Sequence, residues 1–247
     1  MFAKLKQHLF PVQAHFDYSL VLTYAFNPAV LRPLVPDILE LDTFEDRWTF
    51  AAVAMVQTRG LRPLGFPAVL GSDFFLIGYR IFVRYRSSSG QKLRGLYILK
   101  SETDKLRMRL LGNLFTSYQY SRIDAEHGRD DDEVRVRSRK GRLQVRVRHG
   151  GDPKVSLPPG SPFADWRQAR LFSGPLPFTF SVDQQRGQVV IVEGVRESWS
   201  PRPVAVLLHE VEFLEKLGPE PPRLANAFIT ESIPYQWRRG RVEPFSP

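Results

Sequence analysis

Arg80 is the residue whose sequence surroundings most clearly suggest chemistry. It stands in the segment 74–84, where both alternating faces are apolar, so a strand here would be covered on both sides. An arginine is rarely buried without an anionic partner. Either a carboxylate of the protein pairs with Arg80, or Arg80 points into a cavity and holds a ligand's carboxylate or phosphate. Gly78, Tyr79 and Trp199 are expected to line such a site with it, and the missing side chain of Gly78 would let a ligand approach the backbone.

Two lysines are candidates for covalent chemistry. Lys100 ends an alternating segment in which it shares a face with Leu96 and Ile98. A lysine that faces an apolar cavity has a lowered pKa and can form a Schiff base. The alternative is a lysine at a strand end whose charge reaches water. Lys105, at the start of a predicted helix, is open to the same two interpretations.

Glu193 and Glu197 share one face of a predicted strand, and Trp199 follows them. Paired carboxylates can act as general acid and base. A solvated strand edge, or a partner for Arg80, explains them equally well. The five histidines are scattered without ligand spacing, so neither a metal site nor a cofactor is predicted.

The elements that must position these residues are mostly strands. Runs of β-branched, aromatic and alternating apolar residues predict strands, and Asn27 followed by Pro28 predicts the cap and first residue of a short helix. The segment 59–72, rich in Pro and Gly, is predicted to be a loop, and Ser101 or Thr103 to cap a helix that runs to 115. A closing helix is predicted over 223–238. The predicted strands cover 17–26, 47–58, 73–85, 93–100, a hairpin over 133–148, 178–182, 188–195 and 204–211.

The chain is strongly basic, with a net charge of +9 and a pI near 10.0. Its arginines are dispersed except on the predicted hairpin, whose outer face carries Arg135, Arg137, Arg146 and Arg148. A charged outer face that resists edge pairing is the preferred interpretation, ahead of phosphate binding, so nucleic acid is not expected as a partner. The chain has no cysteine, no signal-peptide pattern and no apolar run of membrane-spanning length, which predicts a cytoplasmic protein without membrane contact.

The segment 27–42 also resembles a family signature. Its phrase L-R-x-L-V-P-x-x-L-E-L-D is similar to the entrance of the acetoacetate decarboxylase-like superfamily, and within it to the bacterial-type YqjF-like branch, DUF2071. Arg80 matches the arginine of that branch's N-x-R-T-Y-V segment, and Val195 to Trp199 resembles its V-H-E-x-W strand. The resemblance implies a β-rich α+β fold over residues 1–247: a curled antiparallel sheet or partial β-barrel around a central cavity, with two or three helices in a single domain.

The resemblance does not carry the decarboxylase chemistry with it. True acetoacetate decarboxylases form a Schiff base on one of two adjacent lysines, and these align with Lys105 and Leu106. The two glutamates of that site fall near Ala51 and in the loop 62–66, where no acid stands. We therefore expect a protein that binds an organic acid or other anionic metabolite, with Arg80 as the anchor. A Schiff-base enzyme using Lys100 or Lys105, or a non-catalytic interaction protein with a basic surface, is the alternative, and both enzymatic activity and homo-oligomerisation stay open.

Overall fold

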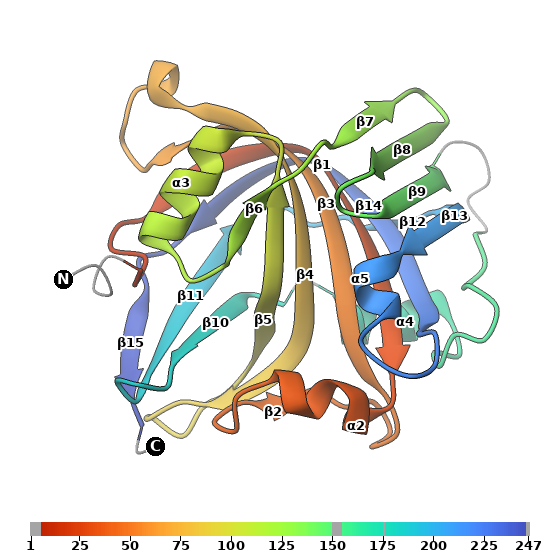
Figure 1. Cartoon of the computed structure of the whole chain (residues 1–247), viewed down its shortest axis with the longest axis horizontal. Coiled ribbons are helices and arrows are strands. Elements are labelled where there is room, and N and C mark those ends of the chain that lie inside the picture. Colours follow the sequence, from red (N-terminus) through yellow and green to blue (C-terminus); the bar gives the residue numbers. More distant parts are fainter. Residues whose placement is uncertain (1–5, 150–154, 175, 246–247) are drawn as a thin grey trace.

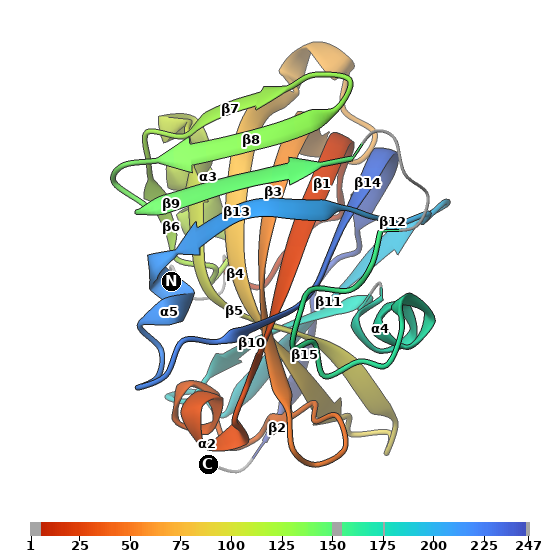
Figure 2. The same cartoon turned by 90° about the vertical axis from the view of Figure 1, so that its right-hand side faces the viewer.

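A large curled sheet and a smaller sheet on its outer face form the molecule (Figures 1 and 2). The structure is a computed structural model, and it describes residues 6–149, 155–174 and 176–245. The large sheet contains β1 (Val12–Phe26), β2 (Glu40–Leu41), β3 (Thr49–Pro63), β4 (Ser72–Arg86), β5 (Lys92–Thr103), β6 (Tyr120–Arg122), β10 (Phe178–Asp183), β11 (Gln188–Arg196), β12 (Arg202–Pro203), β14 (Arg223–Trp237) and β15 (Arg241–Pro244). The smaller sheet contains β7 (Glu126–Arg129), β8 (Glu133–Ser138), β9 (Leu143–Arg148) and β13 (Ala205–Val211).

The large sheet curls until its two ends meet. Its strands follow the order β14-β1-β3-β4-β5-β10-β11, and β11 pairs again with β14 at Gly194–Arg196. The predicted curled, barrel-like fold is therefore confirmed. Most neighbours are antiparallel, but β5 pairs in parallel with both β6 and β10, so the sheet is mixed.

The helices are short and lie at the edges of the sheets (Figure 1). They are α2 (Pro28–Leu31), α3 (Leu106–Phe115), α4 (Trp166–Ser173) and α5 (Glu212–Glu215), with 3-10 turns η1 (Arg32–Leu34) and η2 (Ala68–Leu70). None of the helices in the described ranges is both long and apolar enough to cross a membrane.

The two faces of the central strands have different neighbours. Successive residues of a strand point to opposite faces, so Ile77 and Ile81 of β4 enter the outer core, together with Val136 and Val145 of the smaller sheet. The other face, with Leu76, Arg80 and Phe82, points into the space that the curled sheet surrounds. This double burial explains why the sequence of β4 is apolar on both faces.

Aromatic side chains fill one end of that inner space. Phe163 stacks on Phe50 of β3 with ring centroids 5.3 Å apart, and Phe172 of α4 lies 5.1 Å from Phe50. Phe82 and Ala52 belong to the same buried cluster. This end is therefore largely packed, and the inner space extends from beside Ala52 and Phe82 toward the opposite ends of the strands.

The predicted closing helix over 223–238 is wrong. The segment is β14, which pairs with β1 along nearly its whole length, from Val12↔Trp237 to Ala25↔Arg223. Helical spacing of a few apolar residues did not decide the outcome, because Leu224 to Thr230 are buried on both faces of the sheet. Pro234 removes only one backbone donor from this strand.

Of the other local predictions, the cap of α2 and the hairpin are confirmed, and two others are corrected. Asn27 caps α2, and its Oδ1 accepts a 3.0 Å hydrogen bond from the Ala29 amide. The predicted hairpin is β8 and β9. The predicted loop 59–72 is shorter, because β3 continues to Pro63. Neither Ser101 nor Thr103 caps α3, since both belong to β5 and the helix begins after Lys105 without a side-chain cap.

Candidate functional site

A cavity of about 320 Å³ lies inside the curled sheet. Its walls come from the inner faces of β1, β3, β4, β5 and β14, and α3 and the segment after β3 border it at the end opposite the aromatic cluster. The lining is mostly apolar. Among the described residues it contains one histidine and no lysine, aspartate or glutamate, but it does contain four arginines: Arg62, Arg80, Arg107 and Arg196. Such a cavity is electrostatically suited to an anion.

Arg80 is the main candidate for binding a ligand in this cavity. It lines the cavity, and its Nε is buried without a hydrogen-bond partner. No carboxylate of the described residues lies within ion-pair distance of its guanidinium. Arg80 is half-buried, so its guanidinium has lost part of its hydration without gaining an anion, which is costly. Of the two interpretations of Arg80, the cavity-facing one agrees with these positions, and its role as a ligand anchor stays a prediction.

Gly78 makes room for this guanidinium. A Cβ atom at Gly78 would lie 3.1 Å from both Nε and Nη2 of Arg80, so the arginine folds back along its own strand over the glycine. Ala54 of β3 and Ser101 of β5 stand beside Gly78 in the register of the sheet. These three small residues leave room for the Arg80 guanidinium, which covers Gly78. Gly78 was predicted to line the ligand site, but the guanidinium occupies that space and Gly78 is not part of the described cavity lining.

Three tyrosines of the cavity lining lie close enough to Arg80 to act on its charge. Burial is the main cause that lowers the pKa of the Arg80 guanidinium; Tyr235, Tyr120 and Tyr118 oppose this, and Arg196 adds to it. Burial raises the pKa of Tyr120 to about 12 and raises that of Tyr118 still further, so both phenols stay protonated and can act as donors. The arrangement can hold an anion by charge and by neutral donors together.

The segment after α3 places two of these tyrosines. The Asn113 side chain on α3 holds the backbone of Tyr120. Its Nδ2 donates to the Tyr120 carbonyl and its Oδ1 accepts from the Tyr120 amide, each at 2.8 Å. Gly112 lets the Tyr120 ring pack against the helix, since a Cβ there would lie 2.4 Å from the ring. The sequence analysis did not select Tyr118 or Tyr120; the signal was two tyrosines two residues apart directly after a predicted helix.

Trp199 and Arg196 form a second part of the lining. The Arg196 guanidinium lies 4.5 Å from the Trp199 ring and 5.4 Å from the Tyr235 ring, and its Nη2 donates to the Leu176 carbonyl at 3.3 Å. The indole Nε1 of Trp199 is buried without a partner. Trp199 therefore borders the cavity, and its role in binding a ligand stays a prediction. Arg196 was noted only as a departure from the family pattern, yet it borders the same cavity as Arg80.

His8 borders the cavity near Tyr118, with ring centroids 5.7 Å apart. Burial lowers the pKa of its imidazole to about 4, so the ring is neutral near pH 7. Among the described residues, no group of three or more histidine, aspartate or glutamate side chains is placed to hold a metal ion.

Several predicted site residues lie outside the cavity. Tyr79 faces the outer core, where its hydroxyl donates to Glu102 at 3.2 Å and its ring packs 4.6 Å from Phe213. Lys100 joins this group through a 2.5 Å ion pair between its Nζ and Glu102 Oε1. An irregularity in the pairing of β4 with β5, between Tyr79 and Arg80, accompanies this orientation. The prediction that Tyr79 lines the ligand site is therefore not supported.

The remaining candidates lie at the surface. Lys105 is half exposed and pairs with Asp104 at 3.2 Å. Glu197 is exposed beyond the end of β11, and Glu193 pairs with Arg238 at 2.9 Å. The two glutamates therefore form no acid–base pair with each other or with Arg80.

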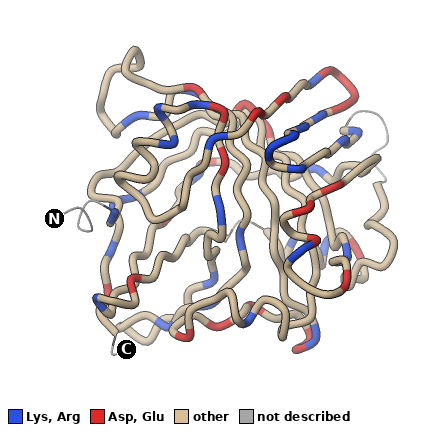
Figure 3. Tube along the Cα trace, viewed as in Figure 1, with Lys and Arg blue, Asp and Glu red and all other residues tan. Residues whose placement is uncertain are grey.

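The arginines on the outer face of the smaller sheet are partly neutralised. Arg135 pairs with Glu133 and Asp130, and Arg148 lies 3.9 Å from Glu133. Both blue and red segments occur in this sheet and its connecting loop in Figure 3. The outer face of the smaller sheet carries charges of both signs, as expected of a solvated surface.

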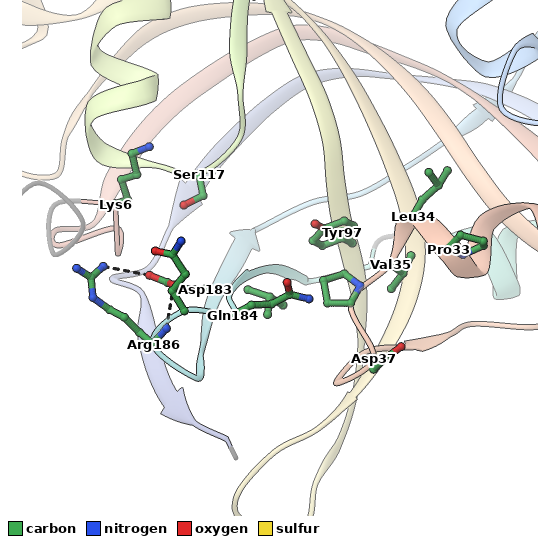
Figure 4. Close-up of a pocket in the computed structure, with 13 residues that line it drawn as sticks. Lys6, Pro33, Leu34, Val35, Asp37, Tyr97, Ser117, Asp183, Gln184 and Arg186 are labelled. Atoms are coloured by element: carbon green, nitrogen blue, oxygen red, sulfur yellow. Dashed lines mark hydrogen bonds and ion pairs between the residues drawn. The ribbon is translucent and has the colours of Figure 1, made fainter. Parts of the chain in front are cut away.

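A second, wider depression lies outside the sheet (Figure 4). It has a volume of about 900 Å³ between Pro33–Asp37 and the turn Asp183–Arg186. Three of its four charged side chains have ion-pair partners: Arg186 pairs with Asp183 at 3.0 Å, and Asp37 lies 3.9 Å from Arg32. None of its lining side chains in the described ranges is buried without a hydrogen-bond partner. The smaller inner cavity is the stronger candidate, because it contains the unsatisfied polar groups.

Solved structures with this fold include enzymes. The acetoacetate decarboxylase of Legionella pneumophila subsp. pneumophila str. Philadelphia 1 aligns with a TM-score of 0.61 at 12% identity, covering 95% of this chain and 88% of that one. The enduracididine biosynthesis enzyme MppR, complexed with pyruvate, aligns with a TM-score of 0.60 at 12% identity, covering 96% and 92%. An acetoacetate decarboxylase-like enzyme from Sphingomonas wittichii RW1 aligns at 0.56 and 15% identity, covering 98% and 94%.

These identities support the likeness in fold alone. No curated protein matches the chain significantly. The model of the DUF2071 family, described as uncharacterized conserved proteins, matches residues 13–234, which is most of the chain. The chain therefore belongs to the DUF2071 family and has an acetoacetate decarboxylase-like fold.

Proposed function

We propose that the protein binds a small organic anion in its inner cavity, with the guanidinium of Arg80 as the anchor. The observation that carries the proposal is a half-buried arginine that faces the cavity, with a buried, unsatisfied Nε and no carboxylate beside it in the described ranges. A ligand carboxylate would supply the missing partner through charge-assisted hydrogen bonds. The pyruvate complex of MppR, which has the same fold, is consistent with an organic acid as the ligand class.

The proposed binding is non-covalent. Schiff-base formation needs an amine in the cavity, and the described lining contains no lysine. Lys100 is held in the outer core by Glu102, and Lys105 points to solvent. Borohydride treatment in the presence of acetoacetate or pyruvate should therefore leave the protein unmodified by mass spectrometry. An adduct on either lysine would favour the alternative of a Schiff-base enzyme.

The test is calorimetric titration of the purified protein with a panel of carboxylates: pyruvate, acetoacetate, butyrate, benzoate and octanoate. Arg80→Met should weaken binding of any acid that binds by about 100-fold, since truncating one partner of a buried charge pair costs about 2–5 kcal/mol. Arg137→Met is the matched control, because Arg137 is exposed on the outer face of β8, and it should bind like the unmodified protein.

Thermal unfolding of both variants completes the test. Equal binding by Arg80→Met and the unmodified protein would overturn the proposal. A collapse in the stability of Arg80→Met would show instead that Arg80 belongs to the structural core.

A further inference from the structure

We propose that the anion bound at Arg80 is amphipathic: a carboxylate with an elongated apolar tail that runs from Arg80 toward the end of the cavity beside α3. This inference rests on the proposed function and adds the ligand class. It is carried by the direction of the Arg80 side chain, the aromatic packing at one end of the inner space, and the apolar residues at the other end.

The Arg80 guanidinium is directed along β4 toward the α3 end. It lies over Gly78, two residues nearer that end, and away from Phe82. Phe82 belongs to the packed aromatic cluster that fills the opposite end. A carboxylate paired with this guanidinium therefore lies on the α3 side of Arg80, and the rest of the ligand extends toward α3. The cavity also reaches residues beside the aromatic cluster, such as Leu176 and Phe228, but the guanidinium points away from them.

The wall along that route is apolar. Beyond Gly78, the cavity face of β4 presents Leu76 and Phe74, and β3 beside it presents Val56 and Leu61. Six residues separate Arg80 from Phe74, roughly 20 Å of extended strand. A charge set against these apolar side chains would lose hydration without gaining a partner. An apolar tail would instead gain from leaving water. Arg62 and Arg107 also line the cavity at this end, and they would favour an anion there.

Exposed apolar residues border the route where it meets the surface. Leu70 and Leu111 line the cavity and are still 49% and 40% exposed. They come from the segment after β3 and from α3, which lie next to each other in Figure 1. Neighbouring apolar side chains on the same two segments are also exposed, namely Leu64, Phe66, Val69, Leu106 and Leu110. Clustered exposed apolar side chains at a cavity entrance are typical of a ligand-binding site.

The volume agrees with a ligand larger than a three-carbon acid. The cavity of about 320 Å³ has room for roughly ten water molecules at ~30 Å³ each. A ligand such as pyruvate would satisfy Arg80 and leave most of the apolar wall in contact with water.

The first experiment is a calorimetric titration with straight-chain carboxylates from acetate to dodecanoate, each below its micelle concentration. Affinity should rise with each methylene by up to about fourfold, the burial of one methylene, until the tail reaches the entrance. Methyl decanoate should bind at least tenfold more weakly than decanoate, because it lacks the charge that pairs with Arg80.

The second experiment changes the entrance without changing the anchor. Leu111→Asp should weaken decanoate binding at least tenfold and leave butyrate binding unchanged, because only the longer tail reaches α3. Leu171→Asp is the matched control: Leu171 is 72% exposed on α4 and does not line the cavity. It should bind both acids like the unmodified protein.

The outcomes separate this inference from the proposed function. Arg80-dependent binding with no dependence on chain length would overturn the inference and keep the proposed function. Equal binding of decanoate and its methyl ester would overturn the anchor at Arg80. An absence of binding by every acid in both panels would overturn both.

Discussion

Arg80 and Arg84 lie on the same strand and face, four residues apart, yet their surroundings differ completely. Arg84 Nε lies 2.5 Å from Asp42 Oδ1, and Arg94 of β5 approaches the other oxygen of Asp42 at 2.6 Å. Arg80 faces tyrosines and a cavity without a described carboxylate. Residue type and strand position therefore do not distinguish a structural arginine from a candidate binding arginine. The partner that the tertiary fold brings to each guanidinium does.

The largest expected effect tests the structural half of this comparison. Asp42→Ala leaves two arginines without the fully buried carboxylate that they share. We expect the free energy of unfolding to fall by about 2–3 kcal/mol. This is at or below the low end of the cost of breaking a buried ion pair, because both arginine side chains are more than one third exposed. Urea denaturation measures it. Asp37→Ala, at an exposed 3.9 Å pair with Arg32, should change stability by less than about 0.5 kcal/mol. Equal effects of the two variants would contradict the assignment.

The same substitution should lower the free energy of unfolding at Arg84 but not at Arg80. Arg84→Met should destabilise the protein by about 1–2 kcal/mol, since Asp42 loses one of its two partners. Arg80→Met should stabilise it by about 1 kcal/mol or leave it unchanged, because an unpaired buried charge is replaced by an apolar side chain. Thermal and urea unfolding without ligand decide between them. A destabilised Arg80→Met would remove the distinction between the two sites.

The dependence of the free energy of unfolding on pH tests whether His8, beside the cavity, is neutral in the folded protein. The folded pKa of His8 is about 4, below the value of ~6.5 in an unfolded chain. The unfolded state therefore takes up the proton first, so this stability is fully present above pH 6.5 and is lost as pH falls toward 4. The contribution is about 1–3 kcal/mol.

His8→Asn should remove this part of the acid sensitivity, and asparagine tolerates the positive φ of 53° at this position. Urea midpoints of both proteins at pH 7 and pH 4.5 measure it. Burial also lowers the pKa of His127 and of His209. Some acid sensitivity therefore persists in the variant, and an unchanged slope would contradict a neutral His8.

The smallest expected effect concerns the glycine under Arg80. Gly78→Ala places a methyl group 3.1 Å from the guanidinium and should displace it by a few tenths of an ångström. We expect about a tenfold loss in affinity for a carboxylate that binds the unmodified protein, with stability changed by less than about 1 kcal/mol. Gly128→Ala is the control, because a Cβ there meets nothing within 4 Å. Unchanged affinity would show that the ligand does not depend on the position of this guanidinium.

The fold was largely predictable from local patterns and from one signature. Alternation identified the hairpin of β8 and β9, and Asn27 with Pro28 identified the start of α2. The resemblance of the segment 27–42 indicated the family, which the match over residues 13–234 confirms. The structure also gives Asp42 in that segment a clear physical role, since it is the buried carboxylate for Arg84 and Arg94. The segment therefore contributes to the fold through this buried carboxylate.

The closing element and half of the candidate site could not be read from the sequence. β14 has helical spacing, but long-range pairing with β1 decided its structure. The irregular pairing between β4 and β5 accompanies the separation of Lys100 and Tyr79 from Arg80, and no sequence pattern announced it. Asn113 and Gly112 of α3 hold Tyr120 beside the cavity that Arg80 lines, and Tyr118 lines the same cavity.

The sequence by itself determined the strand pattern, the family signature, and an arginine in an apolar strand that would need an anion. Only the tertiary structure decided which arginine has no carboxylate partner among the described residues. Burial and hydrogen bonding depend on atoms brought together from distant parts of the chain, as Asp42 is brought to Arg84 and Arg94 and no described carboxylate is brought to Arg80. The alternation of residues along a strand fixes which side a side chain faces, but it does not fix what lies opposite.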